Sequence, residues 1–271
     1  MINGQRISGF VITQNVQEVV RDCLESMKWV DELVVVDSHS DDATRRIAAE
    51  YTNRIIEHEF QGHVAQTRYA FEQTTGDWVL WLDSDERLTG AALDQIRSHL
   101  AGPERDEWDG LAFPRATYFL NRWIRHGGWY PQHKLRLMRR VCAQIVGTEP
   151  HPEAVVQGRV RKLSGDILHL SYPGGVSDYL QRSCRYADIS ARGRFAQGKR
   201  ASWRALLCKP PLVFLKSYVA RAGFLDGVPG LAVAMGSACY RFSRDLRLWE
   251  LEHGRAPEPF EPPDVEPQPE T

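Results

Sequence analysis

Hydrophobic and polar residues change their spacing repeatedly along the first part of the chain. Short apolar runs without polar alternation predict strands that are buried on both faces of a sheet. Between these runs, apolar residues recur at helical spacing, with Asn15 placed to cap one helix and Gly76 placed to close another. The pattern predicts strands at residues 7–13, 33–36, 54–57 and 78–82, and helices at 15–27, 43–51, 63–75 and 89–100.

This alternation of strand and helix predicts βαβ units and an α/β fold with a mainly parallel, doubly wound sheet. Further strands are expected at residues 110–119 and 133–140, and the pattern becomes helical after Gly175. Ligands of such sheets bind beyond the carboxyl ends of the strands. The first strand is not followed by a Gly-x-Gly-x-x-Gly motif, which disfavours a dinucleotide site.

The net charge of −1 conceals a strong asymmetry. Residues 182–247 hold 13 Lys and Arg against three Asp, whereas residues 250–271 hold seven Asp and Glu against one Arg. A basic helical region is typical of a surface for anionic lipid or nucleic acid, or is simply a solvated face. Because no nucleic-acid recognition motif accompanies it, we expect an anionic membrane surface and no nucleic acid. The proline-rich tail at 255–271 is expected to be disordered.

The five cysteines are scattered and include no Cys-x-x-Cys pair. They indicate free thiols in a reducing compartment and argue against a zinc site. The longest weakly polar stretch, 228–240, is shorter than the roughly 20 residues that a spanning helix needs. We therefore expect a cytoplasmic protein without a transmembrane span.

Two carboxylates, Asp83 and Asp85, directly follow the apolar run at 78–82. Residues i and i+2 of a strand share a face, so both would point the same way and suit Mg²⁺ or Mn²⁺ bound to phosphate oxygens. Asn15 and Asp37 also follow strands, and Asp37 could accept hydrogen bonds from a base imide or a ribose hydroxyl. Asp41 or Asp42 fits a helix cap. Arg68 could reach a diphosphate, or could be an isolated surface arginine.

Several ordered segments resemble glycosyltransferase family 2 with the GT-A fold. Residues 10–15, 34–38 and 76–86 carry this resemblance. Residues 127–131, 135–137, 165–169 and 223–227 are similar to the lipopolysaccharide core-type β-glucosyltransferase subgroup. Together they cover about residues 6–250.

The resemblance implies an inverting transfer from a nucleotide-diphosphate sugar, assisted by a divalent cation. Asp37 would then hold the nucleoside, Asp83 the ribose or the metal, and Asp85 the metal. His169 matches a late histidine that completes metal or diphosphate binding; the alternative is a structural hydrogen bond. Gly127 and Gly128 would form a glycine loop near donor and acceptor.

The catalytic base is expected within Thr148-Glu149-Pro150-His151-Pro152-Glu153. An inverting displacement needs a carboxylate that accepts the acceptor hydroxyl's proton. The family often has His-Glu where this chain has His-Pro-Glu, so both glutamates remain candidates, with Glu153 preferred over Glu149. Trp129 and Tyr130 belong to an aromatic loop that suits stacking on a sugar ring, or packs at the edge of a core.

The resemblance thus implies a transferase that moves a hexose, such as glucose, to a lipopolysaccharide core or another surface-glycan acceptor. It would be peripheral on the inner face of the cytoplasmic membrane. The alternatives are transfer to another lipid-linked or surface polysaccharide acceptor, and a non-catalytic nucleotide-sugar-binding protein. We expect a GT-A domain at residues 1–175, a basic amphipathic helical region at 176–254 and the tail at 255–271.

Overall fold

The computed structural model describes residues 1–254, so the tail expected to be disordered lies outside the described residues. The larger sheet contains β1 (Ile7–Thr13), β2 (Glu32–Asp37), β3 (Ile55–Glu57), β4 (Trp78–Trp81), β5 (Glu86–Leu88), β6 (Gly110–Phe119), β7 (Arg122–Trp123), β8 (His133–Arg139), β11 (Val160–Lys162) and β12 (Ile167–Leu170). A separate hairpin consists of β9 (Ala143–Thr148) and β10 (His151–Val156).

The order of the main path is β3-β2-β1-β4-β8-β6-β12-β5, with β7 and β11 paired to β6. The strands from β3 to β4 are parallel. Strand β8 is antiparallel to both β4 and β6. The predicted α/β fold is therefore confirmed; the sheet, expected to be mainly parallel, is parallel in its first half and mixed in its second half.

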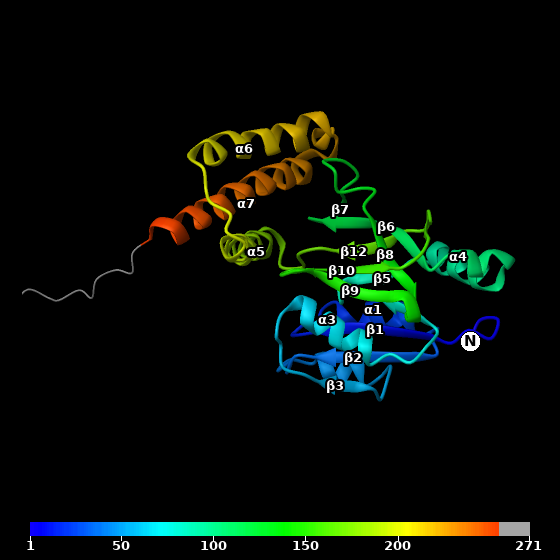
Figure 1. Ribbon diagram of the computed structural model, residues 1–271. Coiled ribbons are helices and arrows are strands. Elements are labelled where there is room, and N and C mark those ends of the chain that lie inside the picture. The colour runs from blue at the N-terminus through cyan, green and yellow to red at the C-terminus, as the bar shows by residue number, and fades with distance from the viewer. Residues whose placement is uncertain (255–271) are drawn as a thin grey trace, which may run out of the picture.

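Seven α-helices accompany the strands within residues 1–254 (Figure 1). They are α1 (Val20–Met27), α2 (Thr44–Ala48), α3 (His63–Glu72), α4 (Gly90–Ala101), α5 (Gly175–Ala196), α6 (Trp203–Leu215) and α7 (Gly227–His253). Short helical turns occur at Pro103–Glu107, Arg140–Cys142, Lys216–Ala220 and Gly223–Asp226.

The parallel strands bury both of their faces, which explains the absence of polar alternation. One face of β1 and β4 packs through residues such as Val11 and Leu80 against α1 and α4. The other face packs through Phe10 and Trp81 against α3 and the β9–β10 hairpin. The rings of Phe10 and Trp81 stack at 6.0 Å. The ends of the parallel strands are thereby fixed between two cores.

Some predicted element boundaries are wrong for local reasons. Helix α1 begins at Val20, and Asn15 adopts a positive φ of 51° instead of capping it. Helix α3 ends at Glu72, so Gly76 does not close it. A Cβ at Gly76 would lie 2.7 Å from the Ser8 backbone nitrogen, so this glycine permits a close approach of two chain segments. The cap by Asp42 is supported by a 2.8 Å hydrogen bond from the Thr44 backbone N–H.

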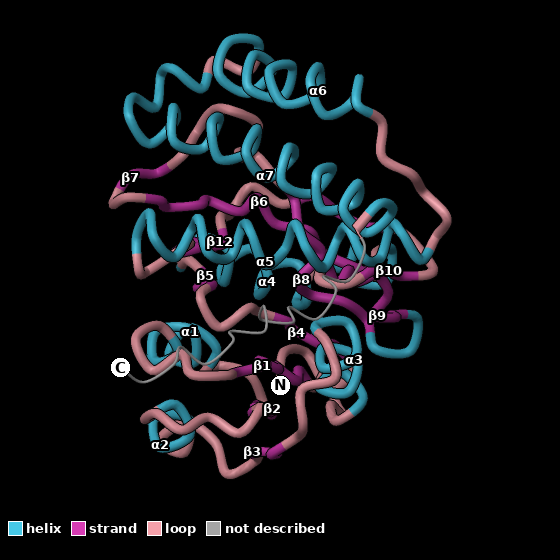
Figure 2. The backbone as a smooth tube through the Cα atoms, turned by 90° about the vertical axis from the view of Figure 1, so that its left-hand side faces the viewer, coloured by secondary structure: helices cyan, strands magenta, loops and turns pink. Residues whose placement is uncertain are grey.

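The last three helices lie at the end of the molecule opposite β3 (Figures 1 and 2). A third apolar cluster, formed by Phe119, Ile124, Tyr179 and Val233, attaches α5 and α7 to the sheet. Within residues 1–254, no single helix is long and apolar enough to cross a membrane. The segments Trp203–Ala220 and Gly223–His253, bent by 71°, satisfy the length and composition criteria only as a pair.

Candidate active site

A cleft of about 1210 Å³ lies at the carboxyl ends of β1 and β4. This is where an open α/β sheet is expected to bind its ligand. The floor includes residues 12–16, at the end of β1 and just beyond it, and residues 83–85, after β4. Strands β8 and β12, the β9–β10 hairpin and α5 supply the remaining walls. Residues from widely separated parts of the chain therefore meet in one cleft.

Asp85 and His169 face each other in this cleft. The Asp85 Oδ2 atom lies 3.4 Å from Nε2 of His169, which β12 presents. The imidazole is positioned by Ser171, whose hydroxyl lies 2.9 Å from Nδ1. Burial opposes the charged form of the Asp85 carboxyl, but His169, followed by Arg115 and Arg182, lowers its pKa below the usual value. The pair therefore offers an anionic oxygen and an imidazole nitrogen at one point.

Asp83 has a different partner. Its Oδ2 atom accepts a 2.5 Å hydrogen bond from Nη2 of Arg136, which also donates to the buried Glu86 at 2.7 Å. The Arg136 guanidinium lies 4.3 Å from the centre of the Trp81 ring. The three ligands expected from the sequence thus do not gather at one point. No group of three or more His, Cys, Asp or Glu side chains within residues 1–254 could hold a metal ion.

The remaining pair still fits a divalent cation that a diphosphate also binds. Mg²⁺ usually takes one or two carboxylates and completes its coordination with phosphate oxygens and water. The acidic groups Asp83, Asp85 and Glu86 outnumber the guanidinium groups of Arg115 and Arg136, which pair with Glu86 and Asp83. Among the described residues, Asp85 is the carboxylate of this group that has no arginine within 4.0 Å, and its neighbour is His169.

Asn15 and Asp37 join the loops after β1 and β2. The Asn15 backbone N–H donates to the Ser40 hydroxyl, and its side-chain oxygen accepts from the Asp41 N–H at 3.0 Å. Asp37 is fully buried and accepts hydrogen bonds from the Thr13 hydroxyl and from both the N–H and the hydroxyl of Ser40. Asn15 lines the cleft, whereas Asp37 lies behind its surface. The Asp37 oxygens are therefore engaged by Thr13 and Ser40, and its expected contact with a nucleoside stays a prediction.

Arg68 and Glu149 do not line the cleft. The Arg68 Nε–H donates to the carbonyl of Ile145 on β9, and its expected contact with a diphosphate stays a prediction. The two Glu149 oxygens accept 2.8 Å hydrogen bonds from the backbone N–H groups of His63 and Val64, the first two residues of α3. Glu149 therefore caps a helix, with both oxygens occupied.

Glu153 is the glutamate that the cleft contains. It lies on β10, paired with Val146 of β9, and its side chain is exposed. Lys134 lies nearby on β8. Burial lowers the pKa of Lys134, with Arg115 and Arg136 adding to the effect, while Glu153 opposes it. Of the two candidate bases, only Glu153 has a carboxylate available to a substrate in the cleft.

The glycine loop lies elsewhere than expected. Its backbone N–H at Gly127 donates to the Arg221 carbonyl at 2.9 Å, and the Ser217 hydroxyl donates to the Gly127 carbonyl. A Cβ at Gly128, whose φ is 88°, would lie 2.1 Å from the Arg221 guanidinium. The loop therefore holds the C-terminal helices rather than lining the cleft.

The aromatic residues that follow also have structural partners. Trp129 packs near Phe119 with ring centres 6.4 Å apart. The Tyr130 hydroxyl donates to Asp166 at 3.0 Å. Neither residue lines the cleft, so the expected stacking of Trp129 and Tyr130 on a sugar ring is not supported.

Helix α5 supplies cleft residues that the sequence did not reveal. Arg182, Arg185 and Tyr186 line the cleft together with Tyr172. The Tyr186 ring lies 6.3 Å from His63 and 6.2 Å from His151. Burial raises the pKa of Tyr186 and lowers the pKa values of both histidines. A helix was expected after Gly175, but nothing in the sequence indicated which of its faces meets the cleft.

Comparisons with known proteins agree with this architecture. The model of the family described as "Glycosyl transferase family 2" matches residues 8–154. The lipopolysaccharide core biosynthesis glycosyltransferase LpsC of Rhizobium meliloti is 27% identical over 257 residues, which cover 92% of this chain and 94% of that protein. An uncharacterized glycosyltransferase of Rickettsia typhi is 28% identical, covering 91% of this chain and 87% of that protein.

Solved structures with a similar fold include two complexes. The mannosyltransferase PcManGT from Pyrobaculum calidifontis, in complex with GDP-Man and Mn²⁺, is 14% identical with a TM-score of 0.49, covering 90% of this chain and 87% of that chain. Residues 1–349 of TarS from S. aureus, in complex with UDP, are 15% identical with a TM-score of 0.48, covering 93% of both chains.

Proposed function

Because the chain belongs to glycosyltransferase family 2, we propose that it transfers a hexose from a nucleotide-diphosphate sugar to a lipopolysaccharide-core or other surface-glycan acceptor. The observation that carries the proposal is the meeting of Asp85, His169 and Glu153 in one cleft at the carboxyl end of β4. A carboxylate–imidazole pair for a cation-bound diphosphate and a separate carboxylate for a proton are the two groups that an inverting transfer needs.

The nucleoside is proposed to lie along the loop after β1, where Asn15 and Ser38 line the cleft. Asp37 acts indirectly, because it fixes Ser40, which in turn receives the Asn15 N–H. Asp85 and His169 would hold a divalent cation together with the donor diphosphate. Such a cation, when bound, neutralises charge on the leaving diphosphate.

Glu153 is proposed as the general base. Its side chain projects from β10 into the cleft, where it can accept the proton of an acceptor hydroxyl. The nearby Lys134 lies among Arg115 and Arg136, so the same wall can also hold negative oxygens of the substrates. Tyr186 and Arg185 of α5 close the cleft on the side of His63 and His151.

The acceptor is proposed to be membrane-embedded. The relative LpsC is named for lipopolysaccharide core biosynthesis, and its similarity extends over the C-terminal helices of this chain. Those helices carry the basic stretch and an unusual number of exposed apolar side chains. A basic surface with exposed apolar residues suits the anionic inner face of the cytoplasmic membrane.

A panel of nucleotide-diphosphate sugars tests the proposal. Thermal shift with Mn²⁺ identifies the bound donor, because a ligand bound only by the folded state raises stability by mass action. Transfer is then followed as nucleotide-diphosphate release with lipopolysaccharide-core, lipid-linked and soluble glycan acceptors. Donor binding without cation-dependent turnover on any acceptor would favour a non-catalytic nucleotide-sugar-binding protein and refute the proposed transfer.

A further inference from the structure

Exposed apolar side chains concentrate in the C-terminal helices to an unusual degree. Helix α6 has no buried residue, although it spans 13 residues. Its first residue, Trp203, is 66% exposed. Contiguous apolar surface of this kind marks an interaction site. The large apolar residues exposed on this unit include Leu207, Leu212, Leu215, Val219, Phe224, Leu225, Val228, Met235 and Phe242.

The charges on α6 differ from those on α7. Arg241 and Arg244 of α7 pair with Asp245, and Arg247 pairs with Asp188. The segment from Trp203 to Ala220 contains no Asp or Glu. Among the residues that the structure describes, its basic side chains have no carboxylate within 4.0 Å; these are Arg204, Lys209 and Lys216. The face therefore suits a partner that is both apolar and anionic.

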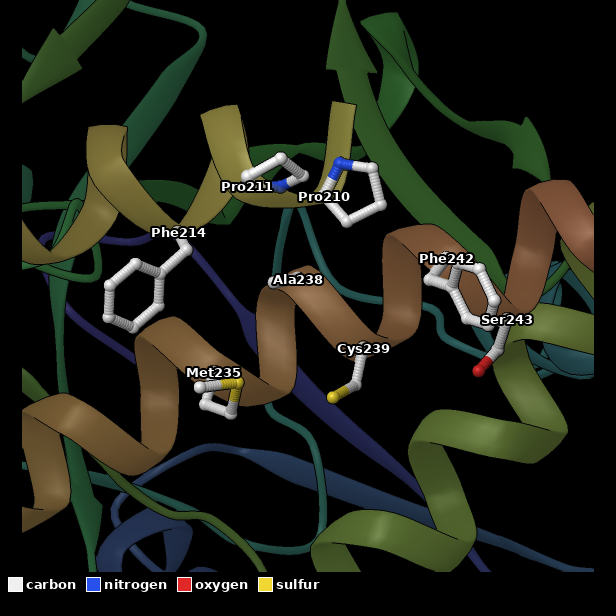
Figure 3. Close-up of a pocket in the computed structure, with 8 residues that line it drawn as sticks. All are labelled: Pro210, Pro211, Phe214, Met235, Ala238, Cys239, Phe242 and Ser243. Atoms are coloured by element: carbon white, nitrogen blue, oxygen red, sulfur yellow. The ribbon is translucent and has the colours of Figure 1, made fainter. Parts of the chain in front are cut away.

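A groove of about 460 Å³ runs between the two helices (Figure 3). Its lining is apolar except for one hydroxyl at an end. Small residues leave it open: Pro210 and Pro211 of α6 lie across from Ala238 of α7, so long side chains do not interdigitate there. The lining residues are Pro210, Pro211, Phe214, Met235, Ala238, Cys239, Phe242 and Ser243.

We propose that this groove binds an acyl chain of an anionic phospholipid from the bilayer. The chain would lie between Phe214 and Met235 at one end and Phe242 at the other. Lys209, which directly precedes Pro210, would be available to the phosphate. This inference rests on the proposed action at a membrane. It adds a specific lipid site, because the groove would bind one lipid molecule while the basic surface attracts anionic head groups in general. Each methylene buried in this way would add to the affinity for the membrane.

Second copies of the chain and acidic proteins are less suitable occupants. Two copies would bring the unpaired basic side chains of α6 together, which is repulsive. A phospholipid supplies both an apolar chain and a negative head group, matching the apolar lining and the neighbouring unpaired cations. A head group alone has no apolar chain to fill the groove.

The native thiols allow a direct test with the full-length protein. Cys239 lines the groove and is exposed, whereas Cys184 of α5 is exposed outside it. Alkylation by N-ethylmaleimide is followed by mass spectrometry of the two peptides. The probe is dihexanoyl-phosphatidylglycerol below its critical micelle concentration. At about ten times its Kd, the lipid should slow alkylation of Cys239 about tenfold by mass action and leave Cys184 unchanged.

Glycerophosphoglycerol, which has the head group without the chains, should give no protection. A matched pair of variants provides the structural control. Met235, 50% exposed, lines the groove, and Val219, 58% exposed, lies outside it on the same unit. Met235→Glu should abolish protection of Cys239 by the short-chain lipid, and Val219→Glu should retain it. Circular dichroism establishes that both variants fold.

Vesicle flotation separates this proposal from the membrane proposal. If phosphatidylglycerol vesicles bind the protein but the short-chain lipid leaves the Cys239 rate unchanged, the groove proposal is overturned and membrane action stands. Cys239 protection that rises with protein concentration in the absence of lipid would assign the groove to a second copy and overturn the proposal. Equal protection of Cys184 and Cys239 would indicate nonspecific coating and also overturn it.

Discussion

Substitution of the two glutamates of the β9–β10 hairpin should separate stability from catalysis. Glu149 and Glu153 lie four residues apart in sequence, yet only Glu153 lines the cleft. Glu149 instead accepts two backbone hydrogen bonds at the beginning of α3. We therefore expect Glu149→Gln to affect mainly folding and Glu153→Gln to affect mainly turnover.

The magnitude for Glu149 follows from its two hydrogen bonds. A hydrogen bond to a charged group is worth about 1.5–3 kcal/mol, and a charge at a helix N-terminus about 0.3–1 kcal/mol. The glutamine keeps one acceptor oxygen but loses the charge and one acceptor, so we expect a loss of about 2 kcal/mol. At about 2–4 °C per kcal/mol, Tm should fall by about 4–8 °C.

Glu153 should show the reverse. Its side chain is exposed on a strand, so Glu153→Gln should change stability by less than about 0.5 kcal/mol. Loss of a general base should lower turnover by about 10²- to 10⁴-fold while donor binding is preserved. Urea unfolding gives the stability of each variant, and nucleotide-diphosphate release below each variant's Tm gives turnover. A large loss of turnover in Glu149→Gln, with none in Glu153→Gln, would refute the assignment and move the base to Glu149.

Three further results are expected. Asp85→Ala should abolish transfer while retaining the fold, because loss of a cation that stabilises the leaving diphosphate costs several kcal/mol of barrier; turnover near that of the wild type in EDTA would contradict this. Lys134→Gln should raise Tm at pH 7, because the lowered pKa of Lys134 means that the folded state carries a partly buried, unfavourable ammonium there. The gain in Tm over the wild type should shrink as pH rises toward 10.5, where the ammonium is lost in both states, and thermal denaturation across pH measures it. Vesicle binding should rise with anionic lipid and fall with salt, and part of it should persist at high salt through apolar side chains such as Trp203. Deletion of residues 256–271 should not weaken the binding. Absence of flotation at low salt would refute the membrane proposal.

The parallel half of the fold was predictable because its strands are buried on both faces. Runs such as Val34–Val36 and Trp78–Trp81 contribute alternate residues to two separate cores, so they contain no polar positions. The later strands β5, β11 and β12 are short and partly exposed, and nothing in their spacing distinguishes them from loops. The hairpin β9–β10 was seen only as a motif carrying two glutamates.

Position directly after a predicted strand indicated which residues line the cleft better than membership in a shared sequence motif did. Asp85 and Asn15 follow strands β4 and β1, and both line the cleft. Glu149 and Gly128 belong to loops whose direction depends on tertiary partners, namely the N-terminus of α3 and the Arg221 side chain. No local pattern encodes these partners.

The charge cluster of Arg136, Asp83 and Glu86 lies beside Asp85 at the carboxyl end of β4, and there the demands of folding and of function differ. Burial of Arg136 with Asp83 and Glu86 requires desolvation of three charged groups, and such clusters seldom add net stability. Among the described residues, the buried Nε–H groups of Arg136 and Arg115 have no acceptor, which adds a further cost. An apolar replacement would satisfy the fold alone. The cluster instead fixes Asp83 beside Arg136 and leaves Asp85 facing His169, so its burial positions the Asp85 carboxylate where a cation-bound diphosphate is proposed to lie.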